Sequence, residues 1–310
     1  MKQYPTLFFF TRPKVPIITI GILLFMALMP ACSPKQLALT PITPTPTRNS
    51  FPGRFVWSDL LTNDLAASQT FYEQLFGWTF EQQGDYTVIF NQGLPIAGMV
   101  KMKSDTPKTA YWIGYVSVPD VEKAVTLVLK NQGTVIAGPG TMLNRGEYVA
   151  IKDPQGARLV LLHSATGDPE QQEIVSGSWL WHELWSKNID TSLTFYTNVL
   201  NYTARAVPAV EPDSSEQNTP TGYQVLNRDD HWCGGITSLP FPDIIPQWVP
   251  AVRVVDLPAI ISRVDKFGGR ILITPSHPLS DGTVALIEDP GGAILMVEVW
   301  QPATEQEVAK

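Results

Sequence analysis

Two short segments place an acidic side chain close to an indole. The segments WSDL and WHEL begin at Trp57 and Trp181, 124 residues apart, and carry Asp59 and Glu183 as their acids. If each segment is a β-strand, the Trp and the acid two residues later lie on one face. A carboxylate beside an indole in a concave site can have a raised pKa and act as a general base, which makes Asp59 and Glu183 catalytic candidates. The alternative is structural, with the carboxylate accepting hydrogen bonds that hold the site together.

His182 stands directly before Glu183 in the second segment. Strand alternation sends the two side chains to opposite faces, so one strand cannot offer both to a metal. We interpret His182 as a hydrogen-bonded histidine on the outer face of the strand, at the domain interface. A register shifted by one residue would instead turn it inward. Together with Glu298 it would then supply two ligands, fewer than a divalent metal site needs.

The residues that follow these two strands repeat as well. FYEQLFGW at 71–78 and FYTNVLNY at 195–202 are again 124 residues apart. Their apolar residues follow a helical period. Asp64 and Asn188 stand where each can cap the helix that begins after it. The repeat therefore predicts a strand followed by a helix in each half of the chain.

A second helix and a turn recur at a different spacing. Asp120 and Asp256 each precede apolar residues at i, i+3, i+4 and i+7. DPQGA at 153–157 and DPGGA at 289–293 keep the same spacing of 136. The change from 124 to 136 indicates a 12-residue insertion in the second half, which we assign to the polar, Pro-rich stretch 208–221. Short β-rich runs fill the spaces, so each half is predicted to contain two βαβββ units.

The first 32 residues form a separate segment. Lys2, Arg12 and Lys14 precede an apolar run over 17–31, which ends directly before Cys32. A basic start, an apolar centre and a small residue before the cut are typical of a secretory signal peptide. A Cys directly after the cut resembles a bacterial lipobox, with Cys32 as the lipidated residue. The alternative is an uncleaved membrane anchor, and either reading predicts an exported, membrane-anchored protein that faces the periplasm or the cell exterior.

Residues 33–53 are rich in Pro, Thr and Ser and show no period, so we predict a linker there. Removing residues 1–31 takes three of the 22 basic residues and none of the 29 acidic ones, which changes the net charge from −7 to −10. This acidic balance argues against nucleic acid as a partner. The other cysteine, Cys233, is predicted to be a small buried residue without a disulfide.

The order of these features resembles the vicinal oxygen chelate superfamily, which includes glyoxalase I, bleomycin-resistance proteins and extradiol dioxygenases. The FYEQLFGW segment behind a Trp-x-acidic-Leu strand and the DPxGA turn before the last strand carry the resemblance, and both occur twice. It covers residues 54–165 and 178–300, is most similar to the tandem two-domain branch, and leaves a tail at 301–310. The resemblance implies an α+β fold of two tandem domains, each of paired βαβββ units whose sheet forms a cup.

The resemblance also implies a divalent metal in the cup, held by His, Gln or Glu side chains on the first and last strands of the paired units. Carried over residue by residue, these positions fall on side chains that cannot chelate. They are Trp57 and Val160 in the first domain and Trp181 and Met296 in the second. We therefore expect no metal cofactor in either cup.

These features predict a protein that binds a small organic molecule in one or both cups, with Asp59 or Glu183 orienting the ligand. One alternative is a metal-dependent lyase or dioxygenase that uses His182, Glu183 or Glu298. Another is a non-catalytic structural or interaction protein whose cups are filled with side chains. The predicted aromatic lining of the cups consists of Trp57, Trp181, Trp112 and Tyr115.

Overall fold

The computed structural model describes residues 39–102, 109–207, 222–229, 231–277 and 282–300. The predicted signal peptide with Cys32, the predicted insertion at 208–221 and the tail at 301–310 lie outside these residues. Among the described residues, no helix is long and apolar enough to cross a membrane.

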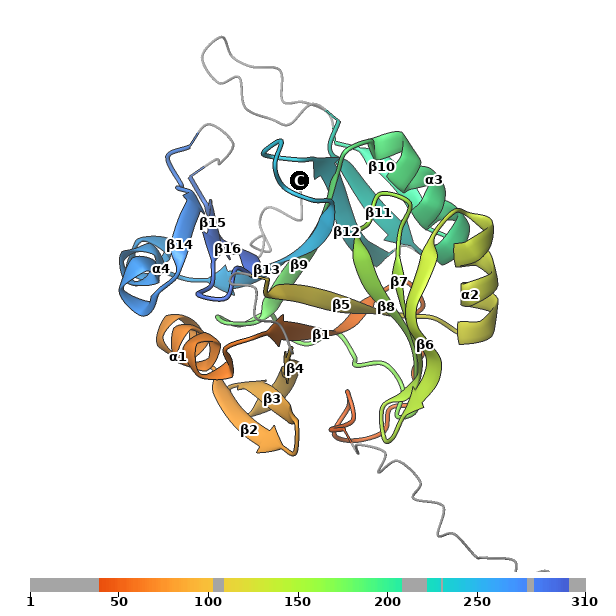
Figure 1. Cartoon of the computed structure of the whole chain (residues 1–310), viewed down its shortest axis with the longest axis horizontal. Helices are drawn as coiled ribbons and strands as arrows, with labels where there is room; N and C mark the ends of the chain where they lie inside the picture. The colour runs from red at the N-terminus through yellow and green to blue at the C-terminus, as the bar shows by residue number, and fades with distance from the viewer. Residues whose placement is uncertain (1–38, 103–108, 208–221, 230, 278–281, 301–310) are drawn as a thin grey trace, which may run out of the picture. The chain divides into compact units, whose positions relative to one another are not determined.

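The first half of the chain forms a mixed sheet of eight strands, in the order β2-β3-β4-β1-β5-β8-β7-β6 (Figure 1). Each βαβββ unit closes on itself, because β4 pairs parallel to β1 and β8 pairs parallel to β5. The units join where β1 and β5 run antiparallel at the centre. The strands are β1 Phe55–Thr62, β2 Thr79–Gln83, β3 Tyr86–Asn91, β4 Leu94–Lys101, β5 Tyr111–Ser117, β6 Thr134–Met142, β7 Gly146–Lys152 and β8 Arg158–Ser164.

The second half repeats this topology in the order β10-β11-β12-β9-β13-β16-β15-β14. Parallel pairs β9–β12 and β13–β16 again flank an antiparallel pair, β9–β13. The predicted α+β fold with tandem βαβββ units is thus confirmed. The strands are β9 Trp179–Ser186, β10 Thr203–Ala206, β11 Gln224–Arg228, β12 His231–Ser238, β13 Gln247–Val254, β14 Arg270–Ile273, β15 Val284–Glu288 and β16 Ile294–Val299.

In the described part of the chain four α-helices lie on these sheets, and each begins directly after a capping residue predicted from the sequence. The helices are α1 Leu65–Phe76, α2 Val121–Lys130, α3 Ile189–Leu200 and α4 Leu257–Val264, the last followed by a short 3-10 helix, Asp265–Phe267. The side chain of each residue before a helix accepts a hydrogen bond from a backbone amide in the first turn. These capping residues are Asp64, Asp120, Asn188 and Asp256.

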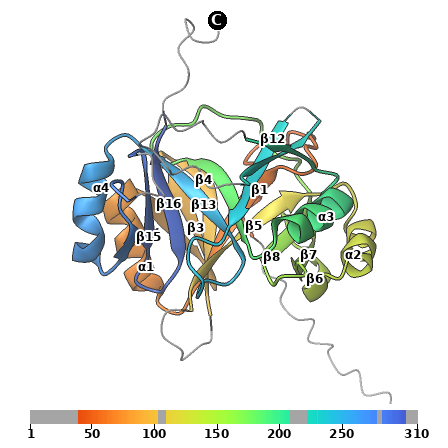
Figure 2. The same ribbon diagram turned by 90° about the horizontal axis from the view of Figure 1, so that it is seen from above.

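The helices of the two domains pack in pairs. In both views α1 lies beside α4, and α2 lies beside α3 (Figures 1 and 2). One apolar core therefore joins Phe71 and Tyr72 of α1 to Ile260 of α4, and a second joins Val128 of α2 to Phe195 of α3. Each core contains residues from both domains. Burial of this apolar surface, the main source of stability, thus depends on the two domains together.

The repeated sequence motifs explain this pairing. The Tyr72 hydroxyl of FYEQLFGW donates to Oδ2 of Asp289 in the DPGGA turn of the other domain, at 3.3 Å. Symmetrically, the Tyr196 hydroxyl of FYTNVLNY donates to Oδ2 of Asp153 in DPQGA, at 3.2 Å. The same carboxylates also accept backbone hydrogen bonds within their own turns. Each motif therefore binds its counterpart in the other domain.

Residues 39–53, the second part of the predicted linker, pack against the first domain, and we call them the strap. Ile42 and Thr43 are 4% and 3% exposed against the first domain. The Asp168 carboxylate accepts hydrogen bonds from the Phe51 amide and the Ser117 hydroxyl, both at 2.6 Å. Composition predicted a spacer because Pro and Thr are common in linkers. It could not reveal that the first domain offers specific partners for this segment.

Candidate functional site

The helix-free face of each sheet carries the predicted site residues. We call the face marked by Trp57 and Asp59 cup 1, and the face marked by Trp181 and Glu183 cup 2. In each first strand the indole and the acid lie on this face, as strand alternation requires, and the residue between them points to the domain interface.

In cup 1, the carboxylate of Asp59 is fully engaged in hydrogen bonds. It accepts from the Trp57 indole at 2.8 Å, and from the hydroxyls of Tyr86 and Tyr115 at 2.6 Å each. Burial together with the nearby Asp59 charge raises the pKa of both tyrosines. Trp57, Asp59 and Tyr86 are 4%, 3% and 2% exposed. This arrangement fits the structural alternative for Asp59.

Arg145 completes cup 1 and is 0% exposed. Its guanidinium donates to the Tyr86 hydroxyl at 2.9 Å and lies 4.0 Å from Oδ1 of Asp59. It also donates twice to the Thr40 carbonyl of the strap, at 2.8 and 3.2 Å. Leu39 and Ile42 of the strap pack in the same apolar cluster as Trp57. Cup 1 is therefore closed by the protein itself.

Cup 2 contains the corresponding residues in a more open setting. The indole of Trp181 donates to the Tyr223 hydroxyl at 2.9 Å, and the indole of Trp185 donates to Glu183 at 2.8 Å. Tyr223 also hydrogen-bonds to Glu183. Burial raises the pKa of Glu183, and the two hydrogen bonds oppose this effect only in part. Trp181, Glu183 and Tyr223 are all half-buried.

The tyrosine that bonds to the Trp indole in each cup was not identified from the sequence. Tyr86 and Tyr223 each stand 12 residues before a glycine, Gly98 and Gly235. In both sheets that glycine pairs with the acidic residue. A Cβ would come within 1.8 Å of the Tyr hydroxyl at Gly98 and 2.0 Å at Gly235, so only glycine leaves room for the phenol. The equal spacing was the signal that could have revealed these tyrosines.

His182 lies at the domain interface, as interpreted from the sequence. Its ring stacks on Phe55 with centroids 3.9 Å apart, and its Nε2 lies 3.3 Å from the hydroxyl of Ser58. Ser58 is the residue that corresponds to His182 in the first repeat. Burial lowers the pKa of His182 to about 3, so the ring is neutral. Its side chain lies on the opposite face of the second sheet from Glu183.

The predicted place of Trp112 in a cup is wrong. Its indole donates to the Tyr72 hydroxyl of α1 at 3.0 Å, and the ring contacts Trp78 and Trp179 in the interdomain core. Tyr115, three residues later on β5, does face cup 1. Residues an odd number apart on a strand point to opposite faces, so the two could not share a cup.

The side chains of the two cups do not form a ligand set for the divalent metal that the fold implies. No group of three or more His, Cys, Asp or Glu residues in the described part of the chain could hold one. In cup 1, the guanidinium of Arg145 lies beside the Asp59 carboxylate and would repel a cation. In cup 2, Glu298 is close enough to raise the pKa of Tyr223, but His182 faces the other way. The structure therefore does not bring His182 and Glu298, the pair expected if a metal were present, to one site.

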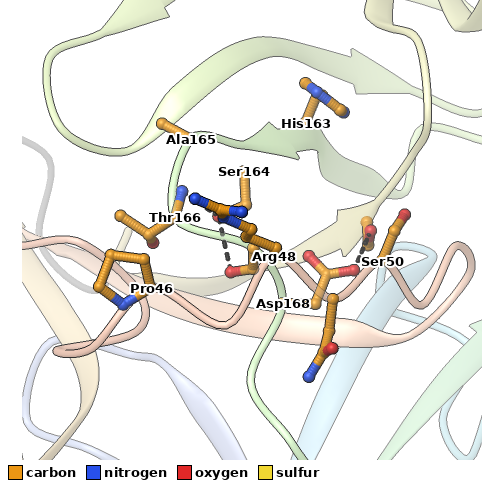
Figure 3. A pocket seen from close by; sticks show the side chains of 11 residues that line it. Pro46, Arg48, Ser50, His163, Ser164, Ala165, Thr166 and Asp168 are labelled. Atoms are coloured by element: carbon orange, nitrogen blue, oxygen red, sulfur yellow. Dashed lines mark hydrogen bonds between the residues drawn. The ribbon is translucent and has the colours of Figure 1, made fainter.

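A separate pocket of about 280 Å³ lies between the strap and the end of β8. Figure 3 shows Asp168 between Arg48 and Ser50 of the strap, with His163 farther away in the lining. Asp168 is 2% exposed and is engaged in holding the strap. None of the predicted site residues lines this pocket. We assign it to the attachment of the strap.

Comparison with known proteins agrees with this fold. Residues 54–161 match the Glyoxalase/Bleomycin resistance protein/Dioxygenase superfamily. The chain is 28% identical to "Putative glyoxylase CFP32" of Mycobacterium bovis over 258 residues, which cover 81% of this chain and 95% of that protein. It is 26% identical to the anthracycline biosynthesis protein DauV of Streptomyces sp. (strain C5), over 80% of this chain and 94% of that one.

Among solved structures, the Mn(II)-bound glyoxalase from Novosphingobium aromaticivorans has the same fold. The TM-score is 0.53 and the identity 15%, with 81% of this chain and 84% of that chain covered. At this identity the likeness extends to the fold alone. Chemistry at the cups has to be argued from the residues of this chain.

Proposed function

Because the chain belongs to the glyoxalase/bleomycin resistance protein/dioxygenase superfamily, we propose that it binds a small organic molecule in cup 2 without a metal. The observation that carries the proposal is the difference in exposure between two equivalent sets of side chains. Trp57, Asp59 and Tyr86 are sealed under the strap, whereas their counterparts in cup 2 are half-buried. A ligand can therefore reach cup 2 and not cup 1.

The side chains of cup 2 suit a flat aromatic ligand. Trp181 and Tyr223 supply partly exposed rings, and Trp232, 69% exposed, stands edge-on to Trp181 with centroids 6.3 Å apart. Ligand sites combine such aromatic area with a few polar groups that fix orientation, here the Glu183 carboxylate and the Tyr223 hydroxyl. The name of the relative DauV points to aromatic compounds of the anthracycline type as probes.

The test is calorimetric titration of the full-length chain with a panel of planar aromatics that includes an anthracycline. Trp181→Leu should weaken binding at least about tenfold, because it removes the main stacking surface. Leu129→Ala, an equally conservative change at a residue 57% exposed on α2, should leave the affinity unchanged. An affinity that Trp181→Leu does not alter would overturn the proposal. Affinity lost after chelator treatment would instead favour the metal-dependent alternative.

A catalytic role for Glu183 is the second candidate. Its raised pKa and its exposure are what a general base requires, whereas Asp59 is sealed and accepts three hydrogen bonds. Deuterium exchange at an acidic C–H of a bound compound would reveal proton abstraction. The exchange rate should rise with pH through the pKa of Glu183 and be lost in Glu183→Gln. Exchange that persists in this variant would exclude the role.

We also propose export and anchoring through Cys32, on the sequence pattern alone. Metabolic labelling with a radioactive fatty acid in a bacterial host should label the wild-type chain. Cys32→Ala should abolish the label. Unlabelled wild-type protein would contradict lipidation.

A further inference from the structure

We infer that the ligand of cup 2 carries an organic cation, such as a guanidinium or amidinium group, which binds between Trp181, Glu183 and Tyr223. This inference rests on the proposed function and names the chemical class of the ligand. It comes from cup 1, where the equivalent side chains surround the guanidinium of Arg145.

The contacts of Arg145 define what such a set of side chains can hold. The guanidinium carbon lies 4.4 Å from the centroid of the Trp57 ring and 5.2 Å from that of Tyr86. Both distances are in the range of cation–π attraction. The same group donates to the Tyr86 hydroxyl and lies beside the negative charge of Asp59. An indole, a phenol and a carboxylate thus form a cation site inside this protein.

Cup 2 reproduces this set with the same backbone geometry. In both cups the Trp indole donates to the Tyr hydroxyl, at 3.0 Å in cup 1 and 2.9 Å in cup 2. In both, the Tyr hydroxyl lies over the glycine that pairs with the acidic residue. Glu183 replaces Asp59 and is longer by one methylene group. The carboxyl group therefore remains in place.

The internal cation of cup 1 has no counterpart in the sequence of cup 2. The 136-residue spacing aligns Arg145 with Asp281, which lies outside the described residues. It also aligns Tyr115 with Ala251, and in the structure these two residues pair with Trp57 and Trp181 in the same way. At the two aligned positions, cup 2 thus has neither the phenol nor the guanidinium, and it keeps the carboxyl group. A ligand can supply the missing positive charge and fill the space.

The contacts of Glu183 agree with this picture. In the described part of the chain, its hydrogen bonds come from the Trp185 indole and the Tyr223 hydroxyl, both neutral donors. Hydrogen bonds between charged partners are roughly twice as strong as neutral ones. A cationic ligand would therefore gain more from Glu183 than a neutral one.

The experiment compares benzamidine with benzamide, which has nearly the same shape but no charge. Both are titrated into the full-length chain by calorimetry and by saturation-transfer NMR. We expect benzamidine to bind at least about tenfold more tightly, and Glu183→Gln to remove that preference while benzamide binding stays the same. Asp59→Asn in cup 1 is the matched control and should leave the preference unchanged. The thermal unfolding midpoint of each variant checks that it is folded.

The outcomes separate the inference from the proposed function. Equal binding of the two compounds, lost in Trp181→Leu, would overturn the cation inference and leave the binding site in place. A preference for benzamidine that survives Glu183→Gln would also overturn the inference, because the cation would then bind elsewhere. Absence of binding by benzamidine, benzamide and the planar aromatic panel would overturn both.

Discussion

Replacing Arg145 with Met should destabilise the protein strongly and detach the strap. The change removes the guanidinium beside Asp59 and so leaves this buried carboxylate, within the described part of the chain, without a counter-charge. Breaking a buried ion pair from one side costs about 3–5 kcal/mol. The Thr40 carbonyl, which is partly buried, also loses the two hydrogen bonds from Arg145, and an unsatisfied buried carbonyl costs about 1–3 kcal/mol.

The geometry around Arg145 indicates that the loss in the free energy of unfolding lies at the lower end of these ranges. The Arg145–Asp59 distance of 4.0 Å is long for an ion pair, and Asp59 keeps three hydrogen-bond donors. The Thr40 carbonyl can also accept a hydrogen bond from water once the strap is released. We therefore expect a loss of about 3–4 kcal/mol in the free energy of unfolding. This corresponds to a fall of roughly 6–10 °C in the unfolding midpoint.

Urea denaturation followed by tryptophan fluorescence measures this loss, and hydrogen exchange provides an independent readout. The Leu39 amide, which donates to the Leu143 carbonyl at 3.2 Å, should exchange faster in the variant. Adding Asp59→Asn to Arg145→Met should recover about 1–2 kcal/mol, because the unpaired charge is then removed. Arg158→Met is the control, since among the described residues the Arg158 guanidinium stacks on Tyr111, 4.5 Å from the ring, and pairs with no carboxylate there.

A loss below about 1 kcal/mol for Arg145→Met, close to that of Arg158→Met, would refute this reasoning. It would mean that cup 1 does not depend on its internal cation. Cup 1 would then no longer be a valid template for cup 2.

Three further predictions concern the interface and cup 2. Tyr72→Phe and Tyr196→Phe each remove a hydroxyl that accepts a hydrogen bond from a Trp indole and donates one to an Asp of the other domain. Each change should therefore lower the free energy of unfolding, measured by urea denaturation, by about 1–2 kcal/mol, and the two losses should be nearly equal. Burial lowers the pKa of His182 from 6.5 to about 3, so between these values the unfolded chain binds a proton and the native state does not. Wild type should therefore lose more stability than His182→Gln as the pH falls from 7 to 4. Parallel profiles of stability against pH would contradict this. Burial raises the pKa of Glu183, so the native state loses stability as the pH rises above the ordinary pKa of a glutamate, where the unfolded chain releases the proton more readily. Glu183→Gln should therefore gain stability relative to wild type between pH 4 and pH 8. A constant difference in the free energy of unfolding would contradict this.

The fold was predictable because its repeats are local and regular. Two spacings, 124 and 136, aligned the strands, helices and turns of the two halves. The side of β9 that carries Glu183 followed from alternation alone. The same rule would have excluded Trp112 from the cup, because it stands three residues from Tyr115 on one strand.

The site was harder to predict because its members come from unrelated parts of the chain. Arg145 is a single arginine in a turn between β6 and β7, with no period or motif to mark it. The strap, over residues 39–53, has the composition of a spacer and is held by hydrogen bonds that only the folded domain provides. The pairing of α1 with α4 was equally hidden, since an apolar stripe shows that a helix is buried but not against which partner.

The mixed cores bear on the order in which the chain acquires its structure during synthesis. The apolar side of α1 is covered in part by residues of the second domain, as far along the chain as Val297. The first domain therefore leaves the ribosome before the surface that completes its core has been made. Contacts so distant in sequence are slow to form, and uncovered apolar surface favours aggregation in the meantime. A chain cut after residue 165 should consequently pair with a second copy or precipitate, and the intact halves should gain their final packing in a single late step.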